Sequence, residues 1–268
     1  MATNGTANGT ANGTANGTAN GTSNGIHPKI TLYTNHLCPW AHRAHITLKE
    51  LGLPFEEVII DLTRPRDEWY LKINPRGLVP SIKYSNGILN EEIITESAIV
   101  SQFLADSHPN ATFFPASHSS PTAPLTRAKI AFFVDTFFTK VQGKITDAVR
   151  FEGSEAEKEE KATAIVEAIR KEIEPLLEKG PYFGGSEGLT LAEALTGPFL
   201  IRLQAYLETD VLASSLSKQL STVPNFSKWS KLVCEQESVN YIFDGPLYVQ
   251  RFQQKMAELK AKAAAAKV

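Results

Sequence analysis

The pattern of hydrophobic and polar positions changes character part of the way along the chain. Residues 30–34 alternate and are rich in β-branched types, which predicts a strand, and apolar positions over 38–52 then recur at helical spacing. Pro39 stands in the first turn of that helix and Gly52 closes it. The pattern next predicts a strand over 55–61, a short helix over 69–73, a hairpin with strands at 78–84 and 88–89, and a helix over 97–105. The order of elements is therefore β-α-β-α-β-β-α.

After a segment rich in Pro, Ser, Thr and His at 107–124, every further pattern is helical. Two apolar stripes recur at helical spacing, and the second lies opposite a charged face. They are Ile130, Phe133, Val134, Phe137, Phe138 and Val141, then Ala162, Ile165, Ile169, Ile173, Leu176 and Leu177. Thr190-Leu-Ala-Glu193 has the form of a capping box that opens a third helix, and two or three more helices are expected between 209 and 266. We interpret the stripes as core packing, so the predicted fold class is α/β plus all-α.

The first 25 residues differ from the rest of the chain. They carry no charged side chain and repeat a tetrapeptide of Ala, Thr or Ser with Asn-Gly-Thr. The period is too short for a solenoid and offers nothing apolar to bury, so a flexible tail is expected. The predicted organisation is a tail (1–25), an α/β domain (26–106), a linker (107–124) and an all-helical domain (125–268).

The charge balance and the cysteine count narrow the class of protein. The 268 residues carry a formal net charge of -2, which gives no general electrostatic reason to bind nucleic acid or an anionic membrane. No apolar run approaches the length of a membrane span, and the N-terminus lacks the basic and apolar segments of a secretory signal. Two cysteines, Cys38 and Cys234, cannot make a disulfide framework, so a reducing, cytoplasmic location is expected.

Cys38 is the strongest candidate for chemistry, because it stands where the first strand leads into the first helix. The free N–H groups and the positive end of the helix dipole favour a thiolate there, and His36, His42 and Arg43 could add positive potential. The position three residues later is Ala41, so the pair that resolves its own mixed disulfide is missing and an outside thiol is implied. The alternative is a buried, inert cysteine, which the strand-to-helix placement makes the weaker interpretation.

Four motifs follow one another along the chain. They are Cys38-Pro-Trp-Ala-His-Arg43, then Asn74-Pro75-Arg-Gly77-Leu-Val79-Pro80, then Thr95-Glu96-Ser97-Ala98-Ile99, and last Tyr182-Phe183-Gly184-Gly185 with Thr190-x-x-Glu193 and Pro198. In this order and at this spacing they resemble the motifs of the cytosolic glutathione transferases, over nearly all of residues 28–250. The first resembles the active-site turn of the cysteine-containing omega-like members, and is also similar to that of the glutathionyl-hydroquinone reductases. Glu193 stands where the family more often has Asp, which leaves the cap chemistry intact.

The resemblance implies a thioredoxin-like first domain that binds glutathione. Glu96 and Ser97 would hold the γ-glutamyl end, Val79 before a cis Pro80 would match the cysteinyl peptide, and Arg66 would lie near the glycyl carboxylate. Taken alone, each has a plainer interpretation. Glu-Ser also caps a helix, Val-Pro is commonly an extended pair, and a surface arginine is unremarkable.

Other candidates keep two interpretations. Trp40 lines the mouth of the site or packs under the first helix, and Arg202 resembles a family position near the acceptor pocket or is a solvated or ion-paired arginine. Cys234, in an apolar helix, is expected to be a small buried hydrophobe. His42 and His45 stand three residues apart with no companion carboxylate or cysteine set, so no metal site is predicted.

The resemblance implies a glutathione-dependent enzyme of the omega-like type, with glutathione as co-substrate and a small hydrophobic or quinone-like acceptor. Expected reactions are thiol transfer, reduction of dehydroascorbate-like compounds, reductive deglutathionylation of aromatic ketones or quinones, and reductive aryl-ether cleavage. The family is usually a homodimer. Two alternatives remain: a binding or regulatory module without turnover, and a ligand carrier that binds hydrophobic dyes without dependence on glutathione.

Overall fold

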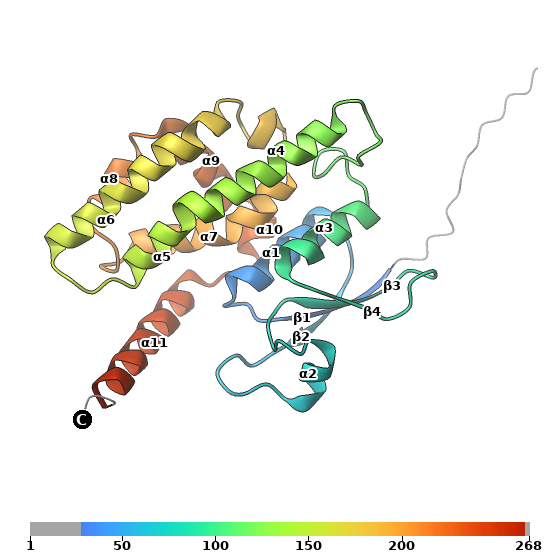
Figure 1. Ribbon diagram of the computed structural model, residues 1–268, viewed down its shortest axis with the longest axis horizontal. Coiled ribbons are helices and arrows are strands. Elements are labelled where there is room, and N and C mark those ends of the chain that lie inside the picture. Colours follow the sequence, from blue (N-terminus) through green and yellow to red (C-terminus); the bar gives the residue numbers. More distant parts are fainter. Residues whose placement is uncertain (1–27, 266–268) are drawn as a thin grey trace, which may run out of the picture.

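The computed structural model describes residues 28–265, which form two parts that pack together (Figure 1). A four-stranded sheet with its own helices makes the first part, and the remaining helices make the second. The predicted tail at 1–25 lies outside the described residues. No helix within residues 28–265 is both long and apolar enough to cross a lipid bilayer.

The first part is a mixed sheet whose order is β2-β1-β3-β4. Strand β1 pairs parallel with β2 and antiparallel with β3, and β3 pairs antiparallel with β4. Its elements are β1 (Lys29–Thr34), α1 (Pro39–Glu50), β2 (Glu56–Ile59), α2 (Glu68–Ile73), β3 (Ser81–Ser85), β4 (Glu92–Thr95) and α3 (Ser97–Ser107). The predicted β-α-β-α-β-β-α order and the thioredoxin-like fold are confirmed.

The two faces of this sheet bury different residues, because successive side chains of a strand point to opposite faces. On one face α1 and α3 pack over a cluster of aliphatic and tyrosine side chains: Ile30, Leu32, Ala44, Leu48, Ile82, Tyr84, Val100 and Leu104. Tyr33 belongs to a separate cluster with Tyr70 of α2. This second cluster also contains Val79 and has Cys38 packed against it. Two candidate site residues therefore lie in or against one cluster at this face of the sheet.

The returning strand of the hairpin was predicted in the wrong place. The sequence pattern put it at 88–89, whereas β4 begins at Glu92. The side chain of Asn86 accepts hydrogen bonds from the N–H groups of Ile88 and Leu89, which shapes a longer turn instead of a ladder. Ile88 is 91% exposed, so its apolar side chain marks no buried strand face.

The second part is helical throughout and contains both predicted stripes. Its elements are α4 (Ala123–Thr136), a π-helical segment (Phe137–Gln142), α5 (Gly143–Val149), α6 (Glu155–Ala168), a π-helical segment (Ile169–Ile173), 3-10 turns (Glu174–Leu177 and Phe183–Gly185), α7 (Leu191–Leu207), α8 (Leu216–Leu220), α9 (Pro224–Cys234), α10 (Glu237–Asn240) and α11 (Gly245–Ala265). Between residue 209 and the end of the described range at 265 there are four helices, where two or three were expected. The additional ones, α8 and α10, are too short for a periodic pattern to appear in the sequence.

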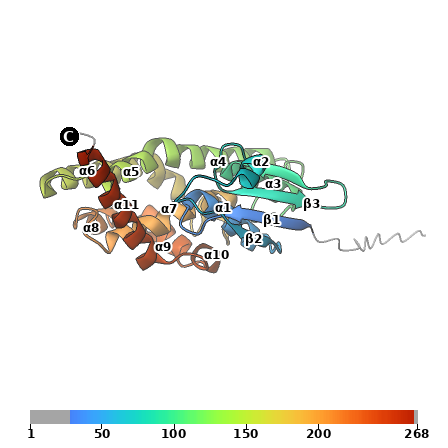
Figure 2. The ribbon, with the colours of Figure 1, turned by 90° about the horizontal axis from the view of Figure 1, so that it is seen from below.

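Helix α7 is the central element of the molecule, buried along most of its length. Figure 2 shows it next to α1, between the sheet and the outer helices. Gly197 permits this closeness, because a Cβ there would lie 3.2 Å from Val233 of α9 and 3.7 Å from Ile46 of α1. A larger residue would press first on Val233 of α9 and would leave no space between α7 and α1.

The capping box at the start of α7 is confirmed and extends beyond a local cap. The buried carboxylate of Glu193 accepts hydrogen bonds from the N–H (2.9 Å) and hydroxyl (2.6 Å) of Thr190. It also accepts from the Phe183 N–H (2.7 Å) and from Nε1 of Trp229 in α9 (2.8 Å). Each donor left unpaired in the core would cost about 1–3 kcal/mol, so Glu193 ties the start of α7 to its surroundings.

Arg202 of α7 joins the helical part to the sheet part. Its guanidinium is buried, and its two terminal nitrogens donate to groups of α7, of α1 and of the turn before α1, while Nε takes no partner among residues 28–265. Nη1 donates to Nδ1 of His42 (3.1 Å) and to the Pro198 carbonyl (2.8 Å), and Nη2 donates to the carbonyls of His36 (3.2 Å) and Leu37 (3.4 Å). The guanidinium therefore holds the turn that leads into Cys38.

His42 must remain neutral for this arrangement to persist. Burial lowers the pKa of His42 well below its usual range, and the charge of Arg202 lowers it further. A neutral imidazole can accept a hydrogen bond at Nδ1 from the guanidinium, whereas a protonated ring presents N–H groups only. Protonation of His42 would thus oppose the contact between the two parts.

The free energy of unfolding should fall as the pH is lowered below about 6.5. Below that pH the unfolded chain binds a proton at His42 that the folded chain does not, which costs about 1.4 kcal/mol per pH unit. In His42→Gln the amide oxygen can accept from Arg202 but does not titrate, so the dependence on pH should weaken. Urea unfolding of both chains at about pH 7, 6 and 5 measures the two slopes. Equal slopes would contradict the role given to His42.

Candidate functional site

Cys38 occupies the N-cap position of α1, with an extended backbone (φ −84°, ψ 117°). Its N–H donates to the carbonyl of Asn35 (3.0 Å), and its carbonyl accepts from the N–H of His42 (3.1 Å). The thiol makes no capping hydrogen bond, and the residue is half-buried. A half-exposed sulfur at the positive end of a helix matches the position that the sequence predicted for it.

Arg43 places a buried positive charge beside this turn. Its guanidinium lies over the rings of Trp40 (4.5 Å), Phe138 (4.4 Å) and Phe199 (5.3 Å). Burial lowers the pKa of Arg43 to about 9, and the neighbouring Cys38 acts in the opposite direction. The side chain is thus still protonated at neutral pH, in surroundings where its field is little screened.

The positive potential around Cys38 has a different source from the one predicted. His42 is held neutral and contributes no charge, and His36 is paired with the Glu57 carboxylate. Arg43 is one of the cations near Cys38, as predicted. Arg202 is the second cation. Burial lowers the pKa of Arg202, and Cys38 acts on it in the opposite direction. No local pattern indicates this second role, because Arg202 comes near the Cys38 turn only when α7 packs on α1.

Val79 lies where a peptide-like ligand could pair with it. The Val79–Pro80 peptide bond is cis, as the motif predicted. The Leu78 carbonyl accepts from Tyr70 Oη (2.5 Å) and from Nδ2 of Asn74 (2.9 Å), which fixes the loop before the cis bond. Within residues 28–265 the N–H and C=O of Val79 take no hydrogen-bond partner, so both are available to a ligand.

Glu96 and Ser97 stand at the start of α3, and Ser97 is linked to Arg43. Glu96 is the N-cap residue with φ 68°, a positive value that is uncommon for a residue other than glycine. Its carboxylate forms an ion pair with Arg76, which the sequence analysis missed. The hydroxyl of Ser97 accepts from Nη1 of Arg43 (3.1 Å), so one guanidinium contacts this helix start and lies beside the Cys38 turn.

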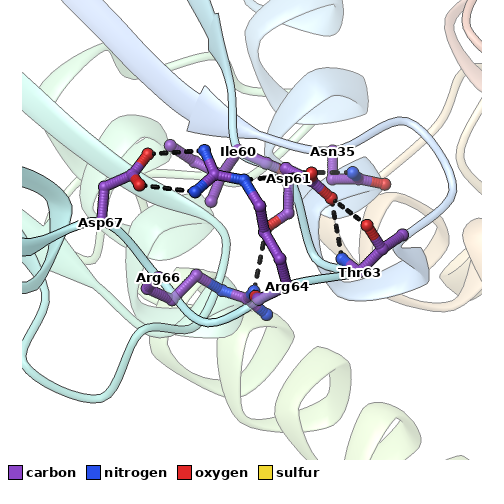
Figure 3. Close-up of polar contacts among 7 residues, drawn as sticks. All are labelled: Asn35, Ile60, Asp61, Thr63, Arg64, Arg66 and Asp67. Atoms are coloured by element: carbon purple, nitrogen blue, oxygen red, sulfur yellow. Dashed lines mark hydrogen bonds and ion pairs between the residues drawn. The ribbon is translucent and has the colours of Figure 1, made fainter.

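Arg66 is engaged with its own loop rather than free (Figure 3). Its Nε donates to the carbonyl of Gly77 (3.0 Å), and its Nη1 donates to the carbonyls of Asp61 (2.8 Å) and Arg64. Gly77 adopts φ 64°, and a Cβ there would lie 2.9 Å from Cγ of Arg66. The side chain thus joins the loop after β2 to the turn that precedes Val79.

Trp40, at the start of α1, packs against two rings of the helical part. It is 44% exposed, and its ring packs on Phe199 (4.9 Å between centroids) and Phe138 (5.5 Å). The sequence pattern places Phe138 in the core with its stripe and indicates no role for Phe199. It therefore does not predict this aromatic group. Cys234 is buried as expected, and burial raises the pKa of its thiol to about 12.

A pocket of about 310 Å³ lies beside the turn before Cys38. It is lined by Asn35, His36, Leu37, Ile59, Ile242, Phe243, Asp244 and Leu247. These residues come from the turn, from β2, from the segment that leads into α11 and from the first turn of α11 itself. Three of the lining residues are thus the same turn that Arg202 holds from α7.

Comparisons with known proteins agree with this geometry. Residues 37–107 match the family model described as "Glutathione S-transferase, N-terminal domain". Glutathione S-transferase omega-1 of Rattus norvegicus is 31% identical over 183 residues, which cover 66% of this chain and 68% of that protein. Glutathione S-transferase omega-2 of Homo sapiens is 28% identical, over 81% of this chain and 83% of its own.

Solved structures give the same result for the whole fold. The crystal structure of glutathione transferase Omega 2C from Trametes versicolor superposes with a TM-score of 0.70 at 25% identity, covering 85% of this chain and 99% of that one. The agreement extends over the sheet part and the helical part together. The chain therefore belongs to the glutathione transferase family as an omega-like member, an enzyme with glutathione as its co-substrate.

Proposed function

We propose that this enzyme transfers glutathionyl groups through the thiolate of Cys38. The observation that carries the proposal is the position of Cys38 at the start of α1, with the buried guanidiniums of Arg43 and Arg202 acting on it. Reactive cysteines stand in electropositive, partly exposed surroundings such as a helix N-terminus, and the thiolate is their reactive form. A cysteine in this position captures glutathione, so we expect little simple conjugation to electrophiles.

The proposed reaction has two steps. The Cys38 thiolate attacks the glutathionyl sulfur of the substrate and forms a mixed disulfide, while the bond from that sulfur to the substrate breaks. The electron pair leaves with the substrate, as a thiolate or as a carbanion next to a carbonyl, which then takes a proton from solvent. The thiolate of a second glutathione attacks the mixed disulfide, releases oxidised glutathione and restores Cys38.

The glutathione would lie between the Val79 loop and the start of α3. The free N–H and C=O of Val79 would pair with the cysteinyl peptide, and Ser97 with the first-turn N–H groups of α3 would bind the γ-glutamyl carboxylate. Glu96 would bind the ammonium group in exchange for its ion pair with Arg76. The sulfur would then reach Cys38, which packs against the same cluster as Val79.

The acceptor would bind on the aromatic group formed by Trp40, Phe138 and Phe199. A half-exposed indole beside two phenyl rings suits a small hydrophobic or quinone-like molecule. Arg43 beneath these rings could stabilise negative charge that develops on the leaving group. The further similarity to glutathionyl-hydroquinone reductases stays a prediction.

Three broader features are proposed on the same basis. We infer that the enzyme acts in the cytoplasm, where its two free cysteines would remain reduced, and that it is a homodimer, as the family usually is. We also keep the division into a glutathione-binding domain (26–106), a linker (107–124) and a helical domain (125–268) as a proposal.

Cys38→Ser should lower the rate of thiol transfer by at least about a hundredfold, because the serine oxygen cannot form a mixed disulfide with glutathione. After incubation with oxidised glutathione, intact mass should show one added glutathionyl group on the native chain and none on Cys38→Ser. The matched control is Cys234→Ala, whose thiol is buried and protonated and which should keep both activity and adduct. Thiol transfer that survives in Cys38→Ser would overturn the assignment.

Arg66→Ala should lower the affinity for glutathione by roughly tenfold, because loss of its charge-assisted bonds releases the Gly77 turn before Val79. If Arg66 acts by positioning this turn, the affinity for γ-glutamylcysteine, which lacks the glycyl carboxylate, should fall by the same factor. Calorimetric titration of both ligands makes the distinction. A loss confined to glutathione would instead mean direct contact with that carboxylate.

Arg64→Ala is the control, since Arg64 lies in the same loop but pairs with the exposed carboxylates of Asp61 and Asp67. It should leave both affinities within about twofold, in keeping with the small energies of surface ion pairs. Equal losses in Arg64→Ala and Arg66→Ala would show that the whole loop has collapsed.

A further inference from the structure

Three side chains outside the proposed glutathione site come together next to the turn before Cys38. His36 of that turn, His45 of α1 and Glu57 of β2 each offer one ligand atom, and these atoms all lie within 4.8 Å of one another. Nε2 of His36 is paired with Oε1 of Glu57, and Nε2 of His45 lies 3.6 Å from the same oxygen. The cluster depends on the parallel pairing of β1 and β2, which sets Glu57 opposite Leu32 on the face that α1 covers.

We propose that these three residues bind a divalent transition-metal ion, with zinc as the best fit. Two imidazole nitrogens and one carboxylate oxygen suit zinc, whereas magnesium and calcium require oxygen ligands. Ligands about 2.0–2.1 Å from a tetrahedral ion lie about 3.4 Å from each other. The 3.6 Å separation of His45 and Glu57 is already close to that value, and a small rotation of the half-exposed His36 would admit the ion.

His45 is already oriented as a metal ligand is. Its ring is buried, and it packs edge-on against Phe55 (5.7 Å between centroids) and Tyr241 (5.9 Å). Nδ1 lies 2.8 Å from the hydroxyl of Tyr241, whose oxygen can accept a hydrogen bond from its N–H, and Nε2 then accepts from the hydroxyl of Thr34 (2.9 Å), a bond that the ion would replace. Imidazoles that bind metals almost always donate their second N–H to such a partner, because this fixes the tautomer and the ring.

The ion would have an entry path and a free fourth position. His36 and Glu57 are partly exposed, with side-chain exposures of 43% and 31%. His36 also lines the pocket of about 310 Å³, which has room for water as the fourth ligand. None of the three ligands is among the residues proposed to bind glutathione, so this centre is separate from the one that holds the co-substrate.

Bound zinc would link β2, α1 and the turn before Cys38 through one ion. It should therefore raise the melting temperature of the chain, since an ion that binds only the folded state stabilises it. The sequence did not reveal the site, because His36, His45 and Glu57 have no metal-ligand spacing and meet only in the folded sheet.

The test is a zinc titration of the untagged full-length chain after treatment with a chelator. Calorimetry should show one ion per chain, and the melting temperature should rise with zinc. Glu57→Gln and His36→Gln should each lower the affinity for zinc by at least about a hundredfold, because each removes a direct ligand. His118→Gln, an exposed histidine elsewhere on the surface, is the control and should bind zinc as the native chain does.

The nearby thiol makes a second control necessary. Cys38→Ser should keep its zinc affinity, and cobalt in place of zinc should give tetrahedral absorption bands without a thiolate charge-transfer band. Loss of zinc in Cys38→Ser, or unchanged affinity in both Glu57→Gln and His36→Gln, would overturn the proposal. The three residues would then be only an ion pair beside a buried histidine.

Discussion

The buried guanidinium of Arg202 is the interaction on which the arrangement of this enzyme depends. It bonds at once to His42 of α1, to its own helix and to two carbonyls of the turn before Cys38. A guanidinium is suited to this role, because its fork of donors can satisfy several acceptors from one fixed position. Burying such a charge is costly, and Nη1 and Nη2 find their partners only in this placement, although Nε has none in the described part of the chain, so the contact favours one relative placement of the two parts.

The site follows from this placement. Once α7 lies against α1, Arg43 is enclosed by Trp40, Phe138 and Phe199, and it reaches the Ser97 hydroxyl at the start of α3. The proposed glutathione and acceptor sites therefore share one cation. Neither part alone encloses this cation, since the ring of Trp40 comes from the sheet part and those of Phe138 and Phe199 from the helical part.

The features that could be predicted from the sequence were local. Cys38 before Pro39, the Val79–Pro80 pair and the Thr190–Glu193 cap are each written in a few neighbouring residues, and the periodic patterns gave the order of elements. The returning hairpin strand failed because Ile88 is apolar yet exposed, and side-chain bonds of Asn86 shape the turn. The exposure of an apolar side chain has no local signature.

The features that could not be predicted depend on contacts between distant residues. The ion pair of Arg76 with Glu96, the roles of Phe199 and Arg202, and the neutral state of His42 all arise only after packing. The cluster of His36, His45 and Glu57 is of the same kind. A pattern of spacing finds ligands on one helix or loop, but not those that a turn, a helix and a strand bring together.

The most direct test is the rate at which a thiol-specific alkylating reagent modifies Cys38 at pH 7 in Arg202→Gln. Circular dichroism must first show that the variant is folded. If the buried cation favours the thiolate and holds its turn, removal should slow the modification by at least about tenfold, or about 1.4 kcal/mol. A folded Arg202→Gln chain in which Cys38 reacts at the native rate would contradict the central role given to this guanidinium.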